Sequence, residues 1–478
     1  MSRTRLYRTA SIAIVSAVSL LGLTGFTVLV VHDPAAELEE HTPGEDGRPA
    51  NLPARPSVDI GRYFAAYDGE ASSIAGSWPK FRGADGSNTS RESVPLVAPD
   101  GDWQPPILWS VELGEGHAGA AVDGGRVYVL DYDEARQADA LRCFSLDDGR
   151  EMWRRWYTVR LKRNHGISRT VPAVGGGTVV TLGPSCQLMA CDAATGKLRW
   201  GIDLTERYGT VVPLWYTGQC PLVDGSQVVV AVGGDVLLAG IDLGSGKVLW
   251  ETPNPRSLAM SHSSVVVATL GGARTYVYAA IGGIAGVSAE PESRGELLWE
   301  TAAFDATVIA PSPVPLGDAR VFVTAGYGAG SILLEVRRAG GAFRVEVLSR
   351  TRPAEGFGCE HQTPILLNGL LVGILPKDAG ARREELACWD PAGRWVWSSG
   401  PERRFGLGPY LVADGKLVIL NQDGVLTIAE ATTEEYRPFA SAKILEGPDA
   451  WAPLAIVSGR LIARDTHRMV CVDLRALR

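Results

Sequence analysis

The sequence predicts an all-β protein, an eight-bladed β-propeller whose blades are four-stranded antiparallel sheets. Three observations predict this fold: a phrase ending in tryptophan that returns at nearly constant spacing, a second phrase of alternating apolar residues in the same phase, and a high content of turn residues. The 478 residues include 56 Gly and 29 Pro, with 45% hydrophobic and 21% charged residues. Such a composition is typical of a globular chain of many short elements joined by turns.

The phrase that ends in tryptophan reads CDAATGKLRW at residues 191–200 and returns as IDLGSGKVLW at residues 241–250. Its Asp can accept turn N–H groups, and its tryptophan ring fits between neighbouring sheets. Gaps of 44, 47, 50, 49 and 98 residues separate the closing tryptophans, which are Trp109, Trp153, Trp200, Trp250, Trp299 and Trp397. Because 98 is twice 49, one copy near Val345 has lost its tryptophan. This period is typical of propeller blades with four strands each.

The second phrase is a small residue or Pro, a few apolar residues, a polar turn with Gly, and an alternating apolar strand. This is the chemistry of hairpins, because Gly reaches positive φ at little cost. Eight copies predict eight blades: GAAVDGGRVYVL, VPAVGGGTVVTL, CPLVDGSQVVVA, SSVVVATLGGARTYVYAA, PSPVPLGDARVFVTA, TPILLNGLLVGIL, GPYLVADGKLVIL and APLAIVSGRLIARD.

The two ends of the propeller, residues 106–478, are complementary. The segment PILWSVEL at its start supplies a tryptophan strand without the first half of the phrase, and MVCVDLRALR at its end supplies that first half alone. We expect these segments to pair in one blade, which would close the ring and remove the free sheet edges.

The N-terminus predicts a membrane anchor. Residues 1–8 carry three arginines, residues 9–31 are uncharged, and acidic residues follow. A stretch of this length suits an uncleaved transmembrane signal anchor better than a cleaved signal peptide, whose apolar core is usually about 7 to 15 residues. The charge asymmetry places residues 1–8 in the cytoplasm and the propeller on the extracytoplasmic, periplasmic side of a bacterial inner membrane, with a single pass.

Two segments separate the anchor from the ring. Residues 32–57 are acidic and Pro-rich and lack core-forming residues, which indicates a solvated linker. Residues 58–105 are rich enough in aromatic residues to dock on the ring, and we expect a short helix in their first part.

Net charge and cysteine positions argue against a nucleic-acid-binding protein and against a disulfide-stabilised scaffold. A net charge of −8 would repel a phosphate backbone, so we expect no nucleic-acid partner. The seven cysteines are odd in number, and Cys143, Cys388 and Cys471 occupy the repeat position that Ala190 and Gly240 hold. Equivalent positions of different blades lie far apart, so small-residue packing explains these cysteines better than disulfides do.

The repeated phrase, together with WPKFRGADGSNTS, EHQTPIL and RFGLGPYLVADG, resembles the pyrroloquinoline-quinone-like (PQQ-like) β-propeller family, from about Trp78 to the C-terminus. The family resemblance covers quinoprotein alcohol dehydrogenases, which are enzymes, and the Bam-complex propeller lipoprotein, which is a scaffold. In the enzymes it implies a quinone at the central opening, a disulfide between adjacent cysteines, a calcium held by Glu and Asn, and an Asp as base. This sequence has no Cys-Cys pair and no C-x-x-C-H haem motif.

Polar residues recur two to five positions ahead of the small-or-Pro position that begins each innermost strand. In a propeller these positions lie near one mouth of the axial channel, where they form a candidate ligand site. The alternative is that they are solvated loop residues without a function. The candidate residues are His117, Arg169, Gln219, His262, Glu360, His361, Gln362 and Arg404.

We interpret the chain as a membrane-tethered binding or scaffold propeller that is not catalytic, with a protein partner or small ligand at the channel mouth. The alternative is a PQQ-dependent oxidoreductase. We assign no catalytic residue, because no nucleophile motif such as G-x-S-x-G is present. We require no cofactor, because the Cys-Cys pair of the quinoprotein enzymes is absent, and PQQ stays the cofactor of the alternative. Two histidines and a carboxylate could hold a metal, yet no local His spacing supports one, so we assign no metal site.

Overall fold

The computed structural model describes residue 16, residues 19–22 and residues 57–476. The chain divides into two compact units, residues 1–56 and residues 57–478. Most of the expected anchor (9–31), the expected cytoplasmic end (1–8) and nearly all of the expected linker (32–57) lie outside the described residues. Within the described part, no helix is long and apolar enough to cross a membrane.

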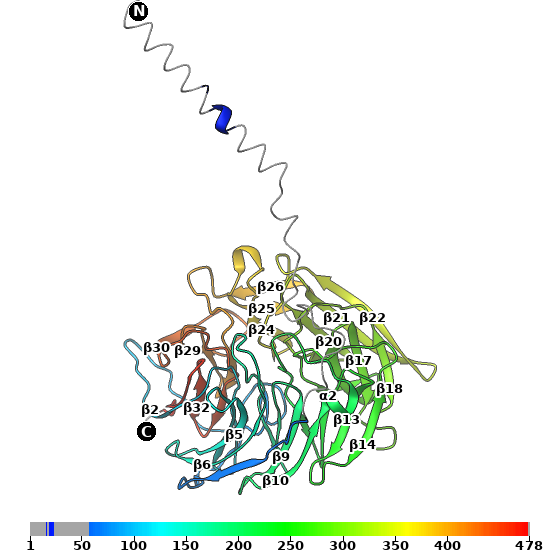
Figure 1. Cartoon of the computed structure of the whole chain (residues 1–478). Helices are drawn as coiled ribbons and strands as arrows, with labels where there is room; N and C mark the ends of the chain where they lie inside the picture. Colours follow the sequence, from blue (N-terminus) through cyan, green and yellow to red (C-terminus); the bar gives the residue numbers. More distant parts are fainter. Residues whose placement is uncertain (1–15, 17–18, 23–56, 477–478) are drawn as a thin grey trace, which may run out of the picture. The chain divides into compact units, whose positions relative to one another are not determined.

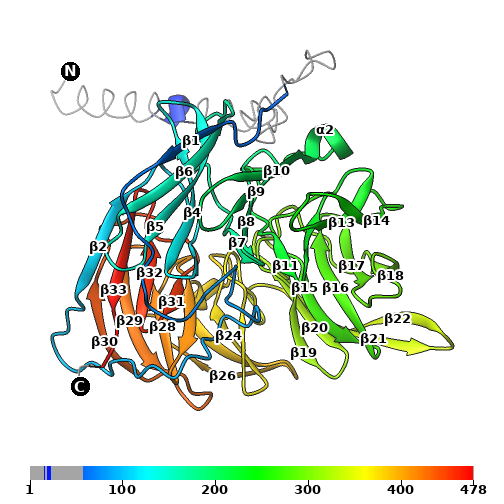
Figure 2. The ribbon, with the colours of Figure 1, turned by 90° about the horizontal axis from the view of Figure 1, so that it is seen from below.

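Eight antiparallel sheets form the ring of the second unit, as predicted (Figures 1 and 2). In the first four blades the strands are β3–β6 (Ala121–Asp123, Arg126–Asp133, Ala138–Ser145, Glu151–Thr158), β7–β10 (Ala173–Gly175, Thr178–Leu182, Gln187–Asp192, Leu198–Asp203), β11–β14 (Leu222–Asp224, Gln227–Ala231, Val236–Asp242, Val248–Pro253) and β15–β18 (Val266–Leu270, Ala273–Ala280, Gly283–Ser288, Leu297–Thr301).

In the other four blades the strands are β19–β22 (Val314–Gly317, Arg320–Ala325, Gly330–Ala339, Ala342–Thr351), β23–β26 (Ile365–Leu367, Leu370–Ile374, Leu386–Asp390, Arg394–Ser398), β27–β30 (Tyr410–Ala413, Lys416–Leu420, Val425–Glu430, Pro438–Lys443) and β31–β33 (Ala455–Val457, Arg460–Arg464, Arg468–Asp473) with β2 (Ile107–Glu112). Two short helical segments complete the ring, α2 (Leu204–Tyr208) and a 3-10 turn (Gly380–Arg382).

The last blade joins the two ends of the ring, which confirms the predicted closure. Strand β2 pairs antiparallel with β33, and Trp109 lies opposite Cys471. A buried arginine ties this blade to the first one, because Arg464 of β32 donates to the carbonyls of Ala118 and Leu130 at 3.3 Å each. Arg464 is 2% exposed, so buried hydrogen bonds join the last blade to the first, in addition to the strand pairing of β2 with β33.

The expectation of a short helix in residues 58–105 is wrong. Strand β1 (Tyr63–Ala66) adds a fifth strand to the first blade and pairs with β6. Aromatic contacts favour this arrangement, since Tyr63 stacks on Trp156 at 5.7 Å between ring centres and Arg155 lies over Phe64 at 4.8 Å. Aromatic residues of this segment thus pair across strands.

The repeated phrase ending in tryptophan is a packing device between blades. In four blades a turn glycine with positive φ lies against the tryptophan of the preceding blade: a Cβ on Gly196 would come within 2.6 Å of Trp153, and one on Gly246 within 2.6 Å of Trp200. The phrase's Asp organises the turn, since Asp192 Oδ1 accepts from the N–H of Thr195 at 2.9 Å. The same contact between successive blades explains why the phrase recurs.

The size of the residue opposite the tryptophan position depends on whether the tryptophan is present. Where the tryptophan is present, its partner across the strand pair is small: Cys143, Ala190, Gly240, Gly286, Cys388 or Cys471. Two blades lack the tryptophan rather than the one predicted, and there Leu333 faces Ser349 and Ile428 faces Ala440. Volume is thus conserved within each pair, as close packing requires.

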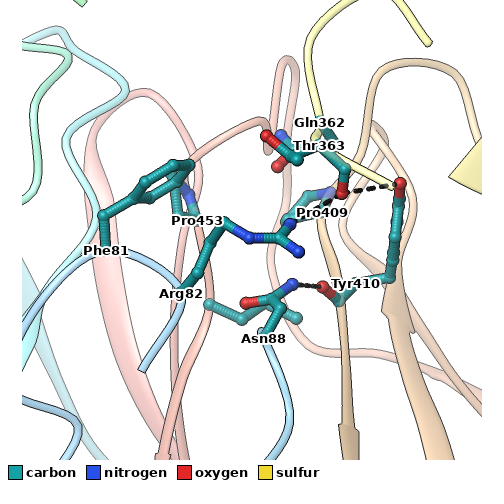
Figure 3. Close-up of a pocket in the computed structure, with 9 residues that line it drawn as sticks. Phe81, Arg82, Asn88, Gln362, Thr363, Pro409, Tyr410 and Pro453 are labelled. Atoms are coloured by element: carbon teal, nitrogen blue, oxygen red, sulfur yellow. Dashed lines mark hydrogen bonds between the residues drawn. The ribbon is translucent and has the colours of Figure 1, made fainter. Parts of the chain in front are cut away.

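The N-terminal docking segment (residues 58–105) lies on the turn ends of the innermost strands. Trp78 bridges to Val122 of β3, and Thr89 bridges to Val412 of β27. Its one buried arginine enters the axis, since Arg82 donates to the carbonyls of Thr363 at 2.7 Å and Pro364 at 3.0 Å, just before β23 (Figure 3). This end of the axial channel is therefore filled by the chain itself.

Candidate functional site

An inner belt of hydrogen bonds encircles part of the axial channel where the innermost strands begin. Each of the first four members donates its backbone N–H to the side chain of the equivalent residue in the next blade, at 3.2, 2.9, 3.1 and 2.8 Å in chain order. These bonds hold the starts of the innermost strands at one level along the channel axis, and so also the residues just before them. Its members are Val171, Cys220, Ser264, Ser312 and Thr363.

Three of the predicted site residues share one position, two residues before the belt. They are Arg169, His262 and His361, which come from alternate blades. The blade between the first two has a glycine there, and a Cβ on Gly218 would lie 2.8 Å from His262 Nδ1. The absent side chain leaves the space that the histidine fills. The alternation of large and small residues brings these three side chains together at one mouth of the channel.

Arg169 is the central cation of the mouth. Its Nη2 donates to the carbonyls of Asn164, His165 and Gly166 at 2.9 Å each. No carboxylate forms an ion pair with it within residues 57–476. Burial lowers the pKa of this guanidinium to about 10, so Arg169 remains charged at neutral pH. Its positive charge is held by neutral carbonyl dipoles alone.

A tryptophan joins two of the predicted histidines. The rings of His117 and Trp451 stack with centres 4.9 Å apart, and His361 meets the same indole edge-on at 5.2 Å. His117 Nε2 lies 3.0 Å from the carbonyl of His165, so this nitrogen carries the proton of the neutral ring. Gln362 holds the tryptophan in place, since its Nε2 donates to the Trp451 carbonyl at 2.9 Å.

The three histidines of the mouth are neutral at pH 7. Burial is the main cause, and the charge of Arg169 is the second: together they lower the pKa of His117 to about 3, of His262 to about 4 and of His361 to about 3. A hydrogen bond to the backbone of Leu214 partly opposes the shift of His262. Because the charge of Arg169 acts on all three rings, all three lie near it.

The other predicted residues have separate places. Gln219 is a fully buried strut that exchanges hydrogen bonds with Ala231 of β12, at 3.0 and 2.6 Å. Glu360 is buried beside the mouth, where it accepts the N–H of Lys377 at 3.2 Å, and burial raises its pKa. Arg404 lies away from the mouth, since it donates to the carbonyls of Pro401, Arg383 and Ala381 and lines a hollow against the outer strand β30.

Sequence reasoning missed the aromatic residues of the mouth. Trp451 stands two residues before Pro453, the small-or-Pro position of the last blade, and so falls within the phase that the polar residues showed, but we considered only polar side chains as ligand groups. Tyr327 lies in the turn between β20 and β21. Its ring meets Trp215 at 5.8 Å between centres, a contact that no periodicity predicts.

Below the mouth the channel contains little free space. A cavity of about 10 Å³, the size of one water molecule, lies among residues of the docking segment and the inner ends of the sixth to eighth blades. Figure 3 shows Arg82 extended into this space beneath Gln362, with Asn88 donating to the Tyr410 carbonyl. The docking segment therefore closes this side of the axis.

The residues present do not fit the quinone arrangement that the resemblance implies. All seven cysteines are buried thiols, and none is adjacent to another in the sequence. No group of three or more His, Cys, Asp or Glu side chains that could hold a metal is found in the described ranges. The arginine from the docking segment already occupies the lower channel. We therefore derive no step through a quinone or calcium.

The family is shown by sequence. The model of the family described as outer membrane protein assembly factor BamB, within the PQQ-like repeats, matches residues 137–392, which is more than half of the chain. The chain belongs to this family. No curated protein matches the sequence.

Solved structures show the same fold in proteins of two kinds. BamB from Moraxella catarrhalis is 14% identical with a TM-score of 0.50, and the match covers 77% of this chain and all of BamB. Quinohemoprotein alcohol dehydrogenases from Pseudomonas putida HK5 and Comamonas testosteroni are 14% and 13% identical, with TM-scores of 0.56 and 0.54, covering 84% of this chain and 81% of theirs. At such identities the likeness establishes the fold and leaves the activity to the site.

Proposed function

We propose that this family member is a non-catalytic binding or scaffold propeller, tethered to the bacterial inner membrane through residues 9–31 with its ring on the periplasmic side. It takes a protein partner or small ligand at the mouth of the axial channel. The observation that carries the proposal is Arg169, bonded to three carbonyls and to no carboxylate of the described residues, at the mouth where His117 and His361 lie against the ring of Trp451. A cation without an ion-pair partner is costly to bury, and an anionic group bound at the mouth would offset that cost.

The alternative is a PQQ-dependent oxidoreductase, and the fold shared with the quinohemoprotein alcohol dehydrogenases is the observation in its favour. Against it stand the thiol state of all seven cysteines and the arginine from the docking segment in the lower channel. The family match to the assembly factor BamB favours a scaffold.

Site-specific photo-cross-linking in cells tests the proposal. A photoreactive residue replaces Tyr327, which is 52% exposed at the mouth, and in a matched control it replaces Phe439, which is 40% exposed on the outer strand β30. We expect discrete cross-linked species from the mouth position and none from the control. Equal labelling from both positions, or none from either, would contradict a binding site at the mouth.

A further inference from the structure

We propose that the mouth recognises the C-terminal aromatic residue of a partner polypeptide, through its carboxylate, its backbone N–H and its ring. This inference rests on the proposed function, because it names the chemistry of the ligand at the same mouth. Three independent features of the described residues carry it: a positive charge without an ion pair, a set of polar atoms without partners, and an aromatic cap.

The cations at the mouth form no ion pair in the described residues, although Glu115 acts on Arg169 and Asp449 on Lys377 from a greater distance. The nearby carboxylates serve other donors: Glu115 pairs with Arg163 at 2.6 Å, and Asp378 accepts the N–H of Gly328 at 2.6 Å. Glu360 accepts the N–H of Lys377, whose own ammonium is 5.8 Å from the centre of the Trp451 ring. In the described part of the chain no ion pair involves this lysine or Arg169. An anion at the mouth would meet two cations.

Three buried polar atoms at the mouth lack hydrogen-bond partners: Arg169 Nε, Trp451 Nε1 and His117 Nδ1. Buried polar atoms without partners are uncommon in folded proteins, because each one loses its bonds to water on burial. A bound ligand would restore those bonds. The first two atoms are donors, which carboxylate oxygens satisfy. The third is an acceptor, because Nε2 of that neutral ring carries the proton. A chain terminus offers both kinds of group together, a carboxylate and the N–H of the same residue.

An aromatic cap lies beside these atoms, formed by Trp215, Tyr216 and Tyr327. The Trp215–Tyr327 contact joins the loop between the second and third blades to a turn of the fifth blade. The third and fourth blades separate this loop from this turn, so the two can be in contact only if both extend across the channel axis. The Tyr216 hydroxyl donates to the Lys162 carbonyl at 2.6 Å, which ties the same loop to the first blade.

The cap is strained. The φ angles of Trp215, Tyr216 and Tyr327 are 61°, 74° and 56°, in the left-handed region that bulky side chains rarely adopt. Such strain is of order 1–3 kcal/mol per residue and persists where it serves a site. It lowers the cost of moving the cap aside, so a terminal carboxylate can reach the donors beneath and an aromatic ring can rest against the cap.

Fluorescence anisotropy with synthetic peptides tests this assignment. The probe is a labelled peptide ending in tryptophan with a free carboxylate, and its matched control is the same peptide with a C-terminal amide. We expect the amide to bind about 10-fold to 100-fold more weakly, as the loss of a charge-assisted hydrogen bond predicts. Indole-3-propionate, an aromatic acid without the peptide N–H, should compete only weakly.

Single substitutions test which residues cause the preference for a free carboxylate. Arg169→Gln should abolish the preference for the free carboxylate, and Lys377→Gln, at an exposed side chain, should weaken it without affecting folding. Arg404→Gln, which removes an arginine away from the mouth, is the matched control and should change nothing. Equal affinity for acid and amide would overturn the inference. Competition by indole-3-propionate as strong as that of the peptide would assign the mouth to a free aromatic acid and overturn the peptide assignment.

The two proposals fail differently. If the Tyr327 position cross-links a partner while the peptides show no carboxylate preference, the mouth binds by other chemistry, and only the inference is wrong. If neither experiment detects binding at the mouth, the proposed function itself is wrong.

Discussion

At the scale of single residues, backbone conformation and side-chain packing together decide which turn glycines of the tryptophan phrase can be replaced. Gly246 has φ of 73°, and a Cβ there would lie 2.6 Å from Trp200 Cγ. Gly244, two residues earlier in the same turn, has no positive φ, and its nearest contact would be 3.6 Å away. The first glycine is required by both backbone and packing, whereas the second is replaceable.

Gly246→Ala should therefore lower the free energy of unfolding by about 2 kcal/mol or more, from backbone strain and overpacking together. Gly244→Ala in the same turn should change it by less than about 0.5 kcal/mol. Equilibrium unfolding in urea measures both. Similar losses in the two variants would show that contact between the turn and the tryptophan of the preceding blade does not stabilise the ring.

The histidines of the mouth make stability depend on pH. Their pKa values of about 3 to 4 lie below the ordinary value of 6.5, so the unfolded chain takes up these protons first. Their contribution is present above about pH 6.5 and is lost as the pH falls towards 4. Glu360 and Asp449, whose pKa values burial raises, act in the opposite sense and remain in the variant described next.

A variant with His262→Asn and His361→Asn should lose less of its melting temperature than the natural protein between pH 7.5 and pH 5. Differential scanning calorimetry at matched ionic strength gives the two curves. Parallel curves would mean that these imidazoles titrate as freely in the folded protein as in the unfolded chain, and so are not buried around Arg169.

At the scale of elements, periodicity predicted the blades well, because each blade buries the same faces in the same order. Closure by β2 and β33 also followed from the sequence, since each end of the chain supplies the half that the other lacks. Strand β1 did not follow, because its aromatic residues acquire their partners on β6, about ninety residues later in the chain. The cap residues escaped prediction for the same reason: their contacts cross blades.

The docking segment also depends on contacts that the sequence does not show. Arg82 is 8% exposed and donates to the carbonyls of Gly86, Ser87, Thr363 and Pro364. Burial lowers its pKa to about 10, so it keeps its charge at neutral pH. Four carbonyls of two distant segments thus share one cation.

Arg82→Met should lower the free energy of unfolding by about 2 to 5 kcal/mol, because the buried carbonyls lose their donor. Arg91→Met is the matched control: it removes an arginine of the same segment whose ion pair with Asp85 is exposed, so its effect should stay below about 1 kcal/mol. Chemical denaturation followed by tryptophan fluorescence compares them. An unchanged free energy of unfolding in Arg82→Met would show that this arginine does not anchor the docking segment to the ring.

At the scale of the whole molecule, the mouth exists only because the ring is closed, since His117, Arg169, His262 and His361 come from four different blades. Sequence phase placed all four in one set of eight, two to five positions ahead of the small-or-Pro position, and the structure shows that three of them share the position two residues before the inner belt. Sequence phase could not separate Arg404, whose phase is similar but whose side chain turns outward to local carbonyls.

Removal of residues 469–478 should destabilise the ring as a whole. It deletes nearly all of β33, leaving β2 and β32 without the strand between them, so the last blade loses its buried interior and the ring gains open edges. A truncated protein with an unchanged melting transition would show that closure does not hold the ring together.

The mouth, on our proposal, binds a partner and does not support quinone redox chemistry. Titration of the purified full chain with pyrroloquinoline quinone in the presence of calcium, followed by quinone absorbance and by alcohol-dependent dye reduction, separates these two functions. We expect no saturable quinone binding at micromolar concentration and no dye reduction. Stoichiometric quinone binding with alcohol-dependent turnover, lost in Arg169→Gln, would refute the proposal and identify the chain as a dehydrogenase.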